Sequence, residues 1–298
     1  MARIFITGDT HGGYKSGGAK LKKFAQNHRF KDDDYLIIAG DFGFIWENEP
    51  DEKEKQWLSW FDAQKFTTLF IDGNHENFNR LKSYKTSFQF GGVVQKISQK
   101  VIHLMCGEIY EIAGFTLFAM GGALSVDKCM RRENISWWSA EAITQDEVST
   151  AWANLASVGR EIDIVITHTC PRNLACGLIS ARNHKKSQDI NMDILQGLCE
   201  GMKFRKWYFG HFHTNRKINQ KFSCFYNKIE KINLKPKANF APKFANLPDR
   251  VTEAIAKFYD EPKFAGEFLQ ILDNACKNGE ISRACKDEIY RRFLAEEF

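Results

Sequence analysis

Short apolar runs alternate with stretches of helical periodicity along most of the chain. The apolar runs predict buried β-strands at 4–7, 35–39, 68–71, 109–112, 116–120, 162–167, 207–209 and 223–226. The stretches between them predict helices at 20–28, 51–63, 143–157 and 189–202. Because amphipathic helices need an apolar surface to cover, this pattern predicts a mixed α/β (α+β) domain whose sheets are flanked by helices.

The C-terminal part of the chain has another pattern. Four of the six prolines lie in one lysine-containing window, and they are Pro236, Pro242, Pro248 and Pro262. Apolar residues recur at helical spacing from Val251 to Phe293, with a break at Asn278-Gly279. We therefore expect one domain at 1–230 and, at 231–298, a linker with a helical appendage of three amphipathic helices. These helices must bury their apolar faces on the first domain or on a second copy of the chain, as in a homo-oligomer.

Composition and charge exclude several classes of protein. Hydrophobic residues make up 43% of the chain and charged residues 27%, which is ordinary for a globular protein and excludes a collagen-like or wholly disordered chain. The 42 basic and 37 acidic side chains give a formal charge of +5. This excess is too small for a protein that coats nucleic acid, but it is compatible with an anionic substrate.

The chain has no features of a membrane or secreted protein. No apolar run approaches the roughly 18 residues of a membrane span, and the first residues lead directly into a predicted strand rather than a signal peptide. The eight cysteines include no C-x-x-C pair, which favours free thiols in a reducing compartment. We expect a cytoplasmic protein.

Five predicted strands end in residue types that bind metals. These pieces are Gly8-Asp9-Thr10-His11, Gly40-Asp41, Gly73-Asn74-His75-Glu76, His168 and Gly210-His211-Phe212-His213. Strand ends in an α/β sheet converge on a common edge, and glycine allows the backbone to turn sharply before a ligand. One common site is therefore the simplest explanation for all five.

Each piece alone also has a structural explanation. The Asp-x-His piece could be a turn carboxylate beside a histidine, and the Gly-Asp piece could cap a helix. His211 and His213 alternate along an extended segment, so both point to one side and could grip one metal or two neighbouring metals. An asparagine next to a histidine is an unusual pair to bury for stability alone. The pieces taken together in this order favour a metal centre.

The ordered set of these pieces resembles the calcineurin-like metallophosphoesterase superfamily over roughly residues 1–229. The segment 121–128, followed by Arg131-Arg132 and Trp137-Trp138, is also similar to small bacterial and phage-borne members. This resemblance implies two stacked mixed β-sheets flanked by helices, with a dinuclear metal centre at the strand ends. The strand pattern described above agrees with that fold.

The resemblance also implies a role for each candidate ligand. One metal would be held by Asp9, His11 and His213, the other by Asn74, His168 and His211, and Asp41 would bridge the two. Two divalent ions close together make a shared hydroxide available at neutral pH, and this hydroxide would attack phosphorus. Imidazole and oxygen ligands suit Mn²⁺, which we expect first, with Fe, Zn²⁺ or Ni²⁺ as alternatives. His75 would be a second catalytic residue beside Asp41, as general acid or phosphate ligand, or else would orient a ligand.

The sequence departs from the protein Ser/Thr phosphatase pattern after Gly40-Asp41. Phe44 and Ile45 stand where that pattern needs an aspartate, which would orient His75, and an arginine, which would bind phosphate. Arg131 or Arg132 could supply the missing cation, although arginines on a loop are more often solvated. The Trp137-Trp138 pair could stack on a base or pack as a lid.

We therefore expect a dinuclear metal-dependent phosphoesterase whose substrate is a small-molecule or nucleotide phosphomonoester or phosphodiester. The alternatives are a protein phosphatase acting on a phosphoprotein, a nuclease acting on nucleic acid, and a non-catalytic interaction module that kept the fold. Loss of ligand residues would indicate such a module, but every ligand type is present.

Overall fold

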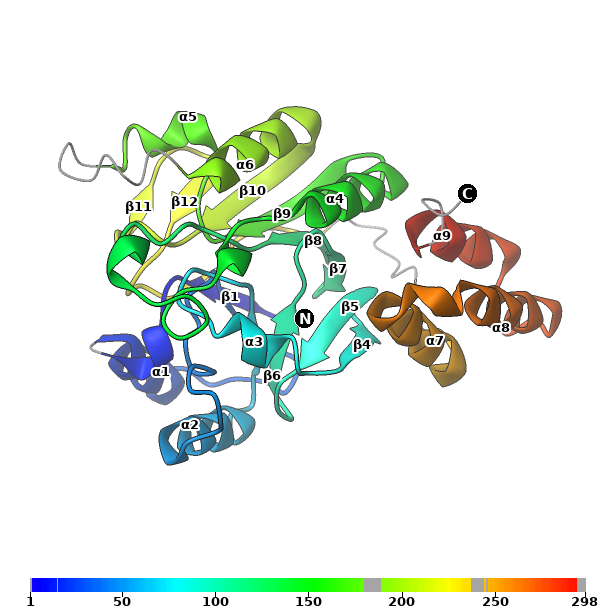
Figure 1. The fold of residues 1–298 in the computed structure, drawn as a ribbon, viewed down its shortest axis with the longest axis horizontal. Coiled ribbons are helices and arrows are strands. Elements are labelled where there is room, and N and C mark those ends of the chain that lie inside the picture. Colours follow the sequence, from blue (N-terminus) through cyan, green and yellow to red (C-terminus); the bar gives the residue numbers. More distant parts are fainter. Residues whose placement is uncertain (1, 15, 180–188, 237–243, 245, 294–298) are drawn as a thin grey trace.

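The chain folds into two β-sheets that stack face to face, with helices on the outer faces (Figure 1). The computed structural model describes all residues except 1, 15, 180–188, 237–243, 245 and 294–298, and the predicted linker residue Pro242 lies outside the described residues. The two stacked mixed sheets with flanking helices agree with the fold class that the sequence predicts.

The first sheet has seven strands in the order β13-β1-β2-β3-β6-β5-β4. Their bounds are β1 Ile4–Thr7, β2 Tyr35–Ile38, β3 Thr67–Phe70, β4 Thr86–Gln89, β5 Gly92–Lys96, β6 Val101–Leu104 and β13 Glu230–Lys231. Strands β1, β2, β3 and β6 run parallel, and the register pairs Ile6 with Ile37 and Ile37 with Leu69. The three strands of this sheet that the sequence predicts, β1 to β3, are therefore neighbours whose carboxyl ends meet at one edge.

The second sheet has six strands in the order β11-β12-β10-β9-β8-β7. Their bounds are β7 Ile109–Ile112, β8 Phe115–Met120, β9 Glu161–Thr167, β10 Lys203–Phe209, β11 Arg216–Lys217 and β12 Phe222–Cys224. Strands β8, β9, β10 and β12 are parallel. Apolar side chains of both sheets, such as Ile6, Leu69, Leu117 and Ile166, form one buried core between them.

Helices cover the outer faces because each presents an apolar stripe there. The first sheet is covered by α1 Ser16–Asn27 and α2 Glu52–Asp62, and the second by α4 Gln145–Ser157 and α6 Ile190–Gly201. The short helices are α3 Phe78–Leu81 and α5 Arg172–Ala175. Each of the four predicted helices is present, and α4 begins with a capping box between Thr144 and Glu147.

Three amphipathic helices follow the proline-containing segment, as the sequence predicts. They are α7 Asp249–Asp260, α8 Ala265–Lys277 and α9 Arg283–Phe293, and a turn of 3-10 helix at Pro262–Phe264 joins α7 to α8. Their apolar faces enclose a separate cluster together with Phe88 of β4 and Val93 of β5. The helices thus pack against the edge of the first sheet of the same chain.

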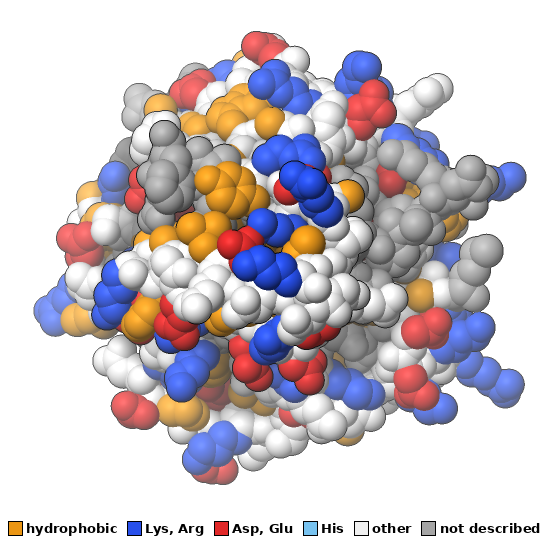
Figure 2. Space-filling model, turned by 90° about the vertical axis from the view of Figure 1, so that its right-hand side faces the viewer, with side chains coloured by type: hydrophobic (Ala, Val, Ile, Leu, Met, Phe, Trp, Pro, Cys, Tyr) orange, Lys and Arg blue, Asp and Glu red, His pale blue; other side chains and the backbone are white. Residues whose placement is uncertain are grey.

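The face of the molecule that carries these helices mixes basic, acidic and apolar side chains, without a large field of one charge (Figure 2). Among the described helices, none combines the length and the apolar character needed to cross a membrane.

Candidate metal centre

Four of the predicted ligands converge at the carboxyl ends of the strands. One ligand atom from each of Asp9, His11, Asp41 and His213 lies within 4.8 Å of the others. Nε2 of His213 is 3.1 Å from Nε2 of His11 and 3.2 Å from Oδ2 of Asp9. These residues follow β1, β2 and β10, so the convergence of strand ends brings together side chains that are about 200 positions apart in sequence.

The remaining predicted ligands form a second group beside the first. We call Asp9, His11 and His213 the first donor set and Asn74, His168 and His211 the second donor set, since each could donate ligand atoms to one metal. Oδ1 of Asn74 lies 3.0 Å from Nδ1 of His211 and 3.3 Å from Nε2 of His168. Asp41 adjoins both sets, because its Oδ1 is 3.2 Å from Nε2 of His168 and its Oδ2 is 3.6 Å from Nδ1 of His11. The structure thus brings all seven candidate ligands together, with Asp41 between the two groups.

Backbone hydrogen bonds hold Asp41 in this central place. Its Oδ1 accepts hydrogen bonds from the amides of Asn74 at 2.9 Å and His75 at 2.8 Å, and its carbonyl oxygen accepts from the amide of His11 at 2.9 Å. Gly40 before it has φ +81°, and a Cβ there would lie 2.1 Å from Nδ1 of His168. Glycine at this position is therefore required both by the turn and by the close approach of a candidate ligand.

The buried carboxylate of Glu76 supports the same turn. It accepts hydrogen bonds from the amides of Phe42 at 2.7 Å and Gly43 at 3.1 Å. Burial raises the pKa of Glu76 well above its ordinary value. Glu76 thus fixes the loop after Asp41 without belonging to either donor set.

The electrostatic environment of the donor sets favours a positive charge. Burial would raise the pKa of Asp41, but the neighbouring imidazoles, above all His168, hold it well below its ordinary value. Burial would likewise lower the pKa of His168, but the carboxylates of Asp41 and Asp9 raise it to about 9. A divalent cation in this position would supply the positive charge that protons otherwise provide.

The ligand atoms of the two donor sets are also arranged to bind metals rather than to hydrogen-bond with one another. Oδ2 of Asp9 is buried and makes no well-formed hydrogen bond to a described residue. Nε2 of His11 and Nε2 of His213 face each other at 3.1 Å, although two unprotonated imidazole nitrogens offer only lone pairs. Carboxylate, amide and imidazole ligands in this number match a dinuclear metal centre.

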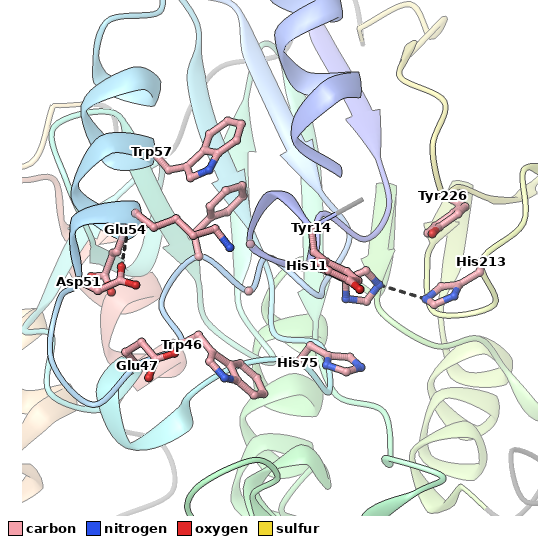
Figure 3. Close-up of a pocket in the computed structure, with 14 residues that line it drawn as sticks. His11, Tyr14, Trp46, Glu47, Asp51, Glu54, Trp57, His75, His213 and Tyr226 are labelled. Atoms are coloured by element: carbon pink, nitrogen blue, oxygen red, sulfur yellow. Dashed lines mark hydrogen bonds between the residues drawn. The ribbon is translucent and has the colours of Figure 1, made fainter. Parts of the chain in front are cut away.

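His75 lies next to the donor sets, as its place after Asn74 predicts. Its ring centroid is 4.9 Å from that of His11, and it is only partly buried. Burial lowers the pKa of His75; the carboxylate of Asp41 opposes this shift, and the positive charge of Arg131 adds to it. The imidazole faces the cavity beside the donor sets together with His11 and His213 (Figure 3).

The two candidate phosphate-binding arginines differ in their surroundings. Nε of Arg131 is 2.9 Å from Oδ1 of Asp127, and its charge acts on His75. Arg132 is exposed, and its backbone amide donates to Oγ of Ser136 at 3.0 Å. Of the two, Arg131 is the one whose charge lowers the pKa of His75.

The two tryptophans of the pair differ in burial, because Trp137 is partly buried and Trp138 is buried. Trp138 is 2% exposed and packs edge-on against Trp46 at 5.5 Å, which matches a packed lid rather than a base-stacking platform. Phe44, which replaces the aspartate of the protein phosphatase pattern, is buried against Phe42 and Trp57.

Two supporting contacts were not predicted from the sequence. Nδ2 of Asn74 lies 3.3 Å from Oγ of Ser125, which donates to Glu141 at 2.9 Å. Nζ of Lys20 donates to the carbonyl oxygens of Gly8 at 2.7 Å and Asp9 at 2.8 Å. Ser125 lies in the segment 121–128 that the resemblance singles out, whereas no local signal marks Lys20 as part of the site.

Comparison with solved structures finds similar chains at low sequence identity. The phosphopantetheinyl hydrolase PptH from Mycobacterium tuberculosis is 15% identical, with a TM-score of 0.47 over 81% of this chain and 98% of that chain. GAP50, the anchor in the inner membrane complex of Plasmodium, is 11% identical, with a TM-score of 0.42 over 76% of this chain and 71% of that chain. No curated protein matches the sequence.

The family comparison covers the part of the chain that carries every candidate ligand. The model of the calcineurin-like phosphoesterases matches residues 2–215, from before β1 to just beyond His213. Because this match spans most of the chain and includes both donor sets, the protein belongs to the calcineurin-like phosphoesterase family.

Proposed function

We propose that the protein is a dinuclear metal-dependent phosphoesterase that hydrolyses a phosphomonoester or phosphodiester. The observation that carries this proposal is the position of Asp41, whose two carboxylate oxygens face two different donor sets. Asp9, His11 and His213 would hold one ion, and Asn74, His168 and His211 the other. Mn²⁺ is the first candidate for both ions, with Fe, Zn²⁺ and Ni²⁺ as alternatives.

Two bound divalent ions would supply positive charge for the phosphoryl oxygens and make water acidic enough to attack phosphorus at neutral pH. Hydrolysis joins the oxygen of water to phosphorus and breaks the bond from phosphorus to the ester oxygen. The electron pair of that bond stays with the ester oxygen, which therefore needs a proton as it leaves. His75, beside the donor sets, is our candidate for the group that binds the phosphate and delivers this proton.

Phe44 narrows the choice of substrate. A carboxylate in its place could align His75 as an acid, whereas the buried phenyl ring cannot. An acid without this support helps least when the leaving oxygen is strongly basic. We therefore propose activated esters, diesters or nucleotide-like phosphates as better substrates than phosphoserine peptides.

Metal analysis and turnover together test the function. We expect purified protein to contain two equivalents of divalent metal, and Mn²⁺-loaded protein to hydrolyse nitrophenyl phosphate or bis-nitrophenyl phosphate. Metal-loaded protein that hydrolyses no phosphate ester would overturn the proposal.

A variant of His75 separates binding from chemistry. His75→Ala should keep the metal content of the wild type and lower turnover by roughly 10²–10⁴-fold if His75 is the general acid. His28→Ala, beyond the end of α1, is the matched control and should change neither quantity. Loss of metal in His75→Ala would instead place His75 among the ligands.

A further inference from the structure

A cavity of about 470 Å³ opens beside the candidate metal centre. His11, His75 and His213 line the cavity at the metal end (Figure 3). Most of the other lining residues belong to the loop after β2 and to the N-terminal half of α2. Its volume is in the range of sites that enclose a small organic molecule. A phosphate held at the metals would therefore have its ester substituent inside this cavity.

Aromatic side chains line the cavity along its length, from Tyr226 beside His213 to Trp46 and Trp57 at the other side (Figure 3). Tyr14, Phe44, Trp46, Trp57 and Tyr226 all line it. Both tryptophans are only partly buried and line the cavity, and Nζ of Lys22 lies over the ring of Trp57 at 5.2 Å from its centroid. Indole faces stack well on planar rings, and each stacked ring contributes on the order of 1–3 kcal/mol to binding.

The surrounding structure holds both indoles in place. Trp57 lies over Gly18, where a Cβ would come within 2.7 Å of Cζ2 of the indole, and Phe44 packs against it at 4.9 Å. Trp46 packs edge-on against the buried ring of Trp138 and lies 6.2 Å from the ring of His75. Rigid aromatic walls lose little conformational entropy when a ligand binds.

Acidic side chains line the end of the cavity away from His213 (Figure 3). Glu54 is buried and paired with Arg80 at 2.8 Å, and Asp51 caps α2 with its Oδ1. Within the described part of the chain, no residue donates a hydrogen bond to the carboxylate of Glu47 or to Oδ2 of Asp51. These oxygens can accept hydrogen bonds from a ligand, and they disfavour a second anionic group at this end despite the nearby Lys53.

We propose that this cavity binds the base of a nucleotide, as the ester substituent of the substrate. A nucleobase combines a planar ring for the indoles with hydrogen-bond donors at its edge for Glu47 and Asp51, and its phosphate lies at the metal end. This inference rests on the proposed function and names the substrate class of the same site. The cavity then makes Trp46 and Trp57 specificity-determining residues.

A pair of substrates with the same ester bond tests the proposal. Adenosine monophosphate and ribose 5-phosphate have the same leaving oxygen, an alkoxide about as basic as that of phosphoserine, so both should be hydrolysed slowly. They differ in the base, so the ratio of their rates isolates its contribution. On Mn²⁺-loaded protein we expect kcat/KM for adenosine monophosphate to be at least about 10-fold higher, because a stacking contribution of about 1.4 kcal/mol corresponds to that factor. Equal values of kcat/KM for the two substrates would overturn the nucleotide proposal and leave the phosphoesterase proposal intact. If the protein hydrolyses neither of these substrates nor the nitrophenyl esters, both proposals are wrong.

Substitutions of the tryptophans locate the effect in the cavity. Trp46→Leu and Trp57→Leu should each bring the ratio of kcat/KM for the two substrates toward one, mainly through KM. Trp152→Leu in α4 removes a partly buried tryptophan far from the cavity and should leave the ratio unchanged. An unchanged ratio in both cavity variants would contradict the proposal.

Binding of a nucleoside, which carries no phosphate to hydrolyse, gives a second test. Calorimetric titration of the full chain should show binding of adenosine and none of ribose. Glu47→Ala should weaken adenosine binding at least threefold, whereas Glu49→Ala, at an equally exposed acid outside the cavity, should not. Because Glu47 is exposed, its variant remains folded even if a tryptophan variant does not. Equal adenosine binding in Glu47→Ala and Glu49→Ala would count against the base-binding cavity.

Discussion

Four of the seven candidate ligands have a backbone conformation that residues other than glycine rarely adopt. His11, Asp41, His211 and His213 have φ values of 45°, 50°, 65° and 51°. Such left-handed conformations cost about 1 kcal/mol or more each, and they persist only where the surrounding structure enforces them. Their concentration at one place indicates that these residues are positioned for chemistry at the expense of stability.

Asp41 is the residue whose replacement should affect both metals. In Asp41→Asn the amide oxygen can still accept the hydrogen bonds from Asn74 and His75, but the negative charge between the two donor sets is lost. We expect lower metal occupancy and at least a ~10²-fold lower rate. Elemental analysis and nitrophenyl ester hydrolysis measure the two effects. Two bound metals with near-normal turnover would refute the bridging role.

Glu141 predicts a pH dependence of stability. Its side chain is buried, and burial raises its pKa from 4.5 to about 7. The folded state therefore holds this proton more tightly than the unfolded state, so the contribution of Glu141 to stability is complete below about pH 4.5 and is lost as pH rises to 7 and above. Between pH 5 and 8, the free energy of unfolding of wild type should fall relative to that of Glu141→Gln by on the order of 2 kcal/mol.

Denaturant titrations of both proteins at the two pH values measure this difference. Glu49→Gln, at an exposed position, is the control and should follow wild type at both pH values. A constant difference between wild type and Glu141→Gln would show that Glu141 does not titrate in this range.

At the scale of elements, the loop after β8 supports the end of β3 across the sheet interface. It carries Ser125, whose amide and hydroxyl both donate to the carboxylate of Glu141, at 2.7 Å and 2.9 Å. Oγ of Ser125 in turn lies 3.3 Å from Nδ2 of Asn74. This contact sets which end of the Asn74 side chain faces His168 and His211, so that the oxygen is presented to the second donor set.

Removal of the Ser125 hydroxyl should therefore weaken metal binding without removing a ligand. We expect Ser125→Ala to lower the affinity for one of the two metals by about 10-fold, and Ser125→Thr to restore most of it. Competition with a chelator measures the affinity, and Ser59→Ala on the exposed face of α2 is the control. If Ser125→Ala binds both metals with wild-type affinity, then Ser125 does not orient Asn74 and the prediction is wrong.

At the scale of the whole molecule, one arginine ties the last helix to α4, to the start of β7 in the second sheet and, through the carbonyl oxygen of Gly91, to the turn between β4 and β5 of the first sheet. Arg292 of α9 has a 4% exposed side chain and donates hydrogen bonds to Glu108 at 2.7 Å, Asn154 at 2.9 Å and the carbonyl oxygen of Ile109 at 2.9 Å. Glu108 is itself fully buried. The C-terminal helices are thus held by a buried ion pair as well as by their apolar faces.

Replacement of Arg292 should destabilise the protein. Arg292→Met leaves the carboxylate of Glu108 buried without its partner, which costs about 3 kcal/mol or more. We expect a clearly lower Tm with unchanged metal content, because the arginine lies away from the donor sets. Arg291→Met, at the exposed neighbouring position, should change little. Equal Tm values for the two variants would show that the ion pair adds nothing to the attachment of α9.

The part of the fold that carries the candidate ligands was largely predictable because its signals are local. Each predicted strand is a short apolar run, and the metal-binding residue types follow the strands directly, so the topology of a parallel sheet was enough to place them at one edge. The strands β4, β5, β6, β11 and β13 were not predicted. Their apolar runs are very short or are interrupted by polar residues, as by Gln95 in β5 and His103 in β6. Pro262 was assigned to a linker, but it begins the turn between α7 and α8.

The chain by itself determined which residues could bind metals, because residue type and the glycines beside it are properties of the sequence. Only the tertiary structure decided that Asp41 lies between two donor sets, that Ser125 and Glu141 orient Asn74, and that Trp46 and Trp57 face one cavity. These relations join residues of separate elements through contacts that no local pattern encodes. They depend on how strands and helices pack, which is decided by the burial of apolar surface over the whole molecule.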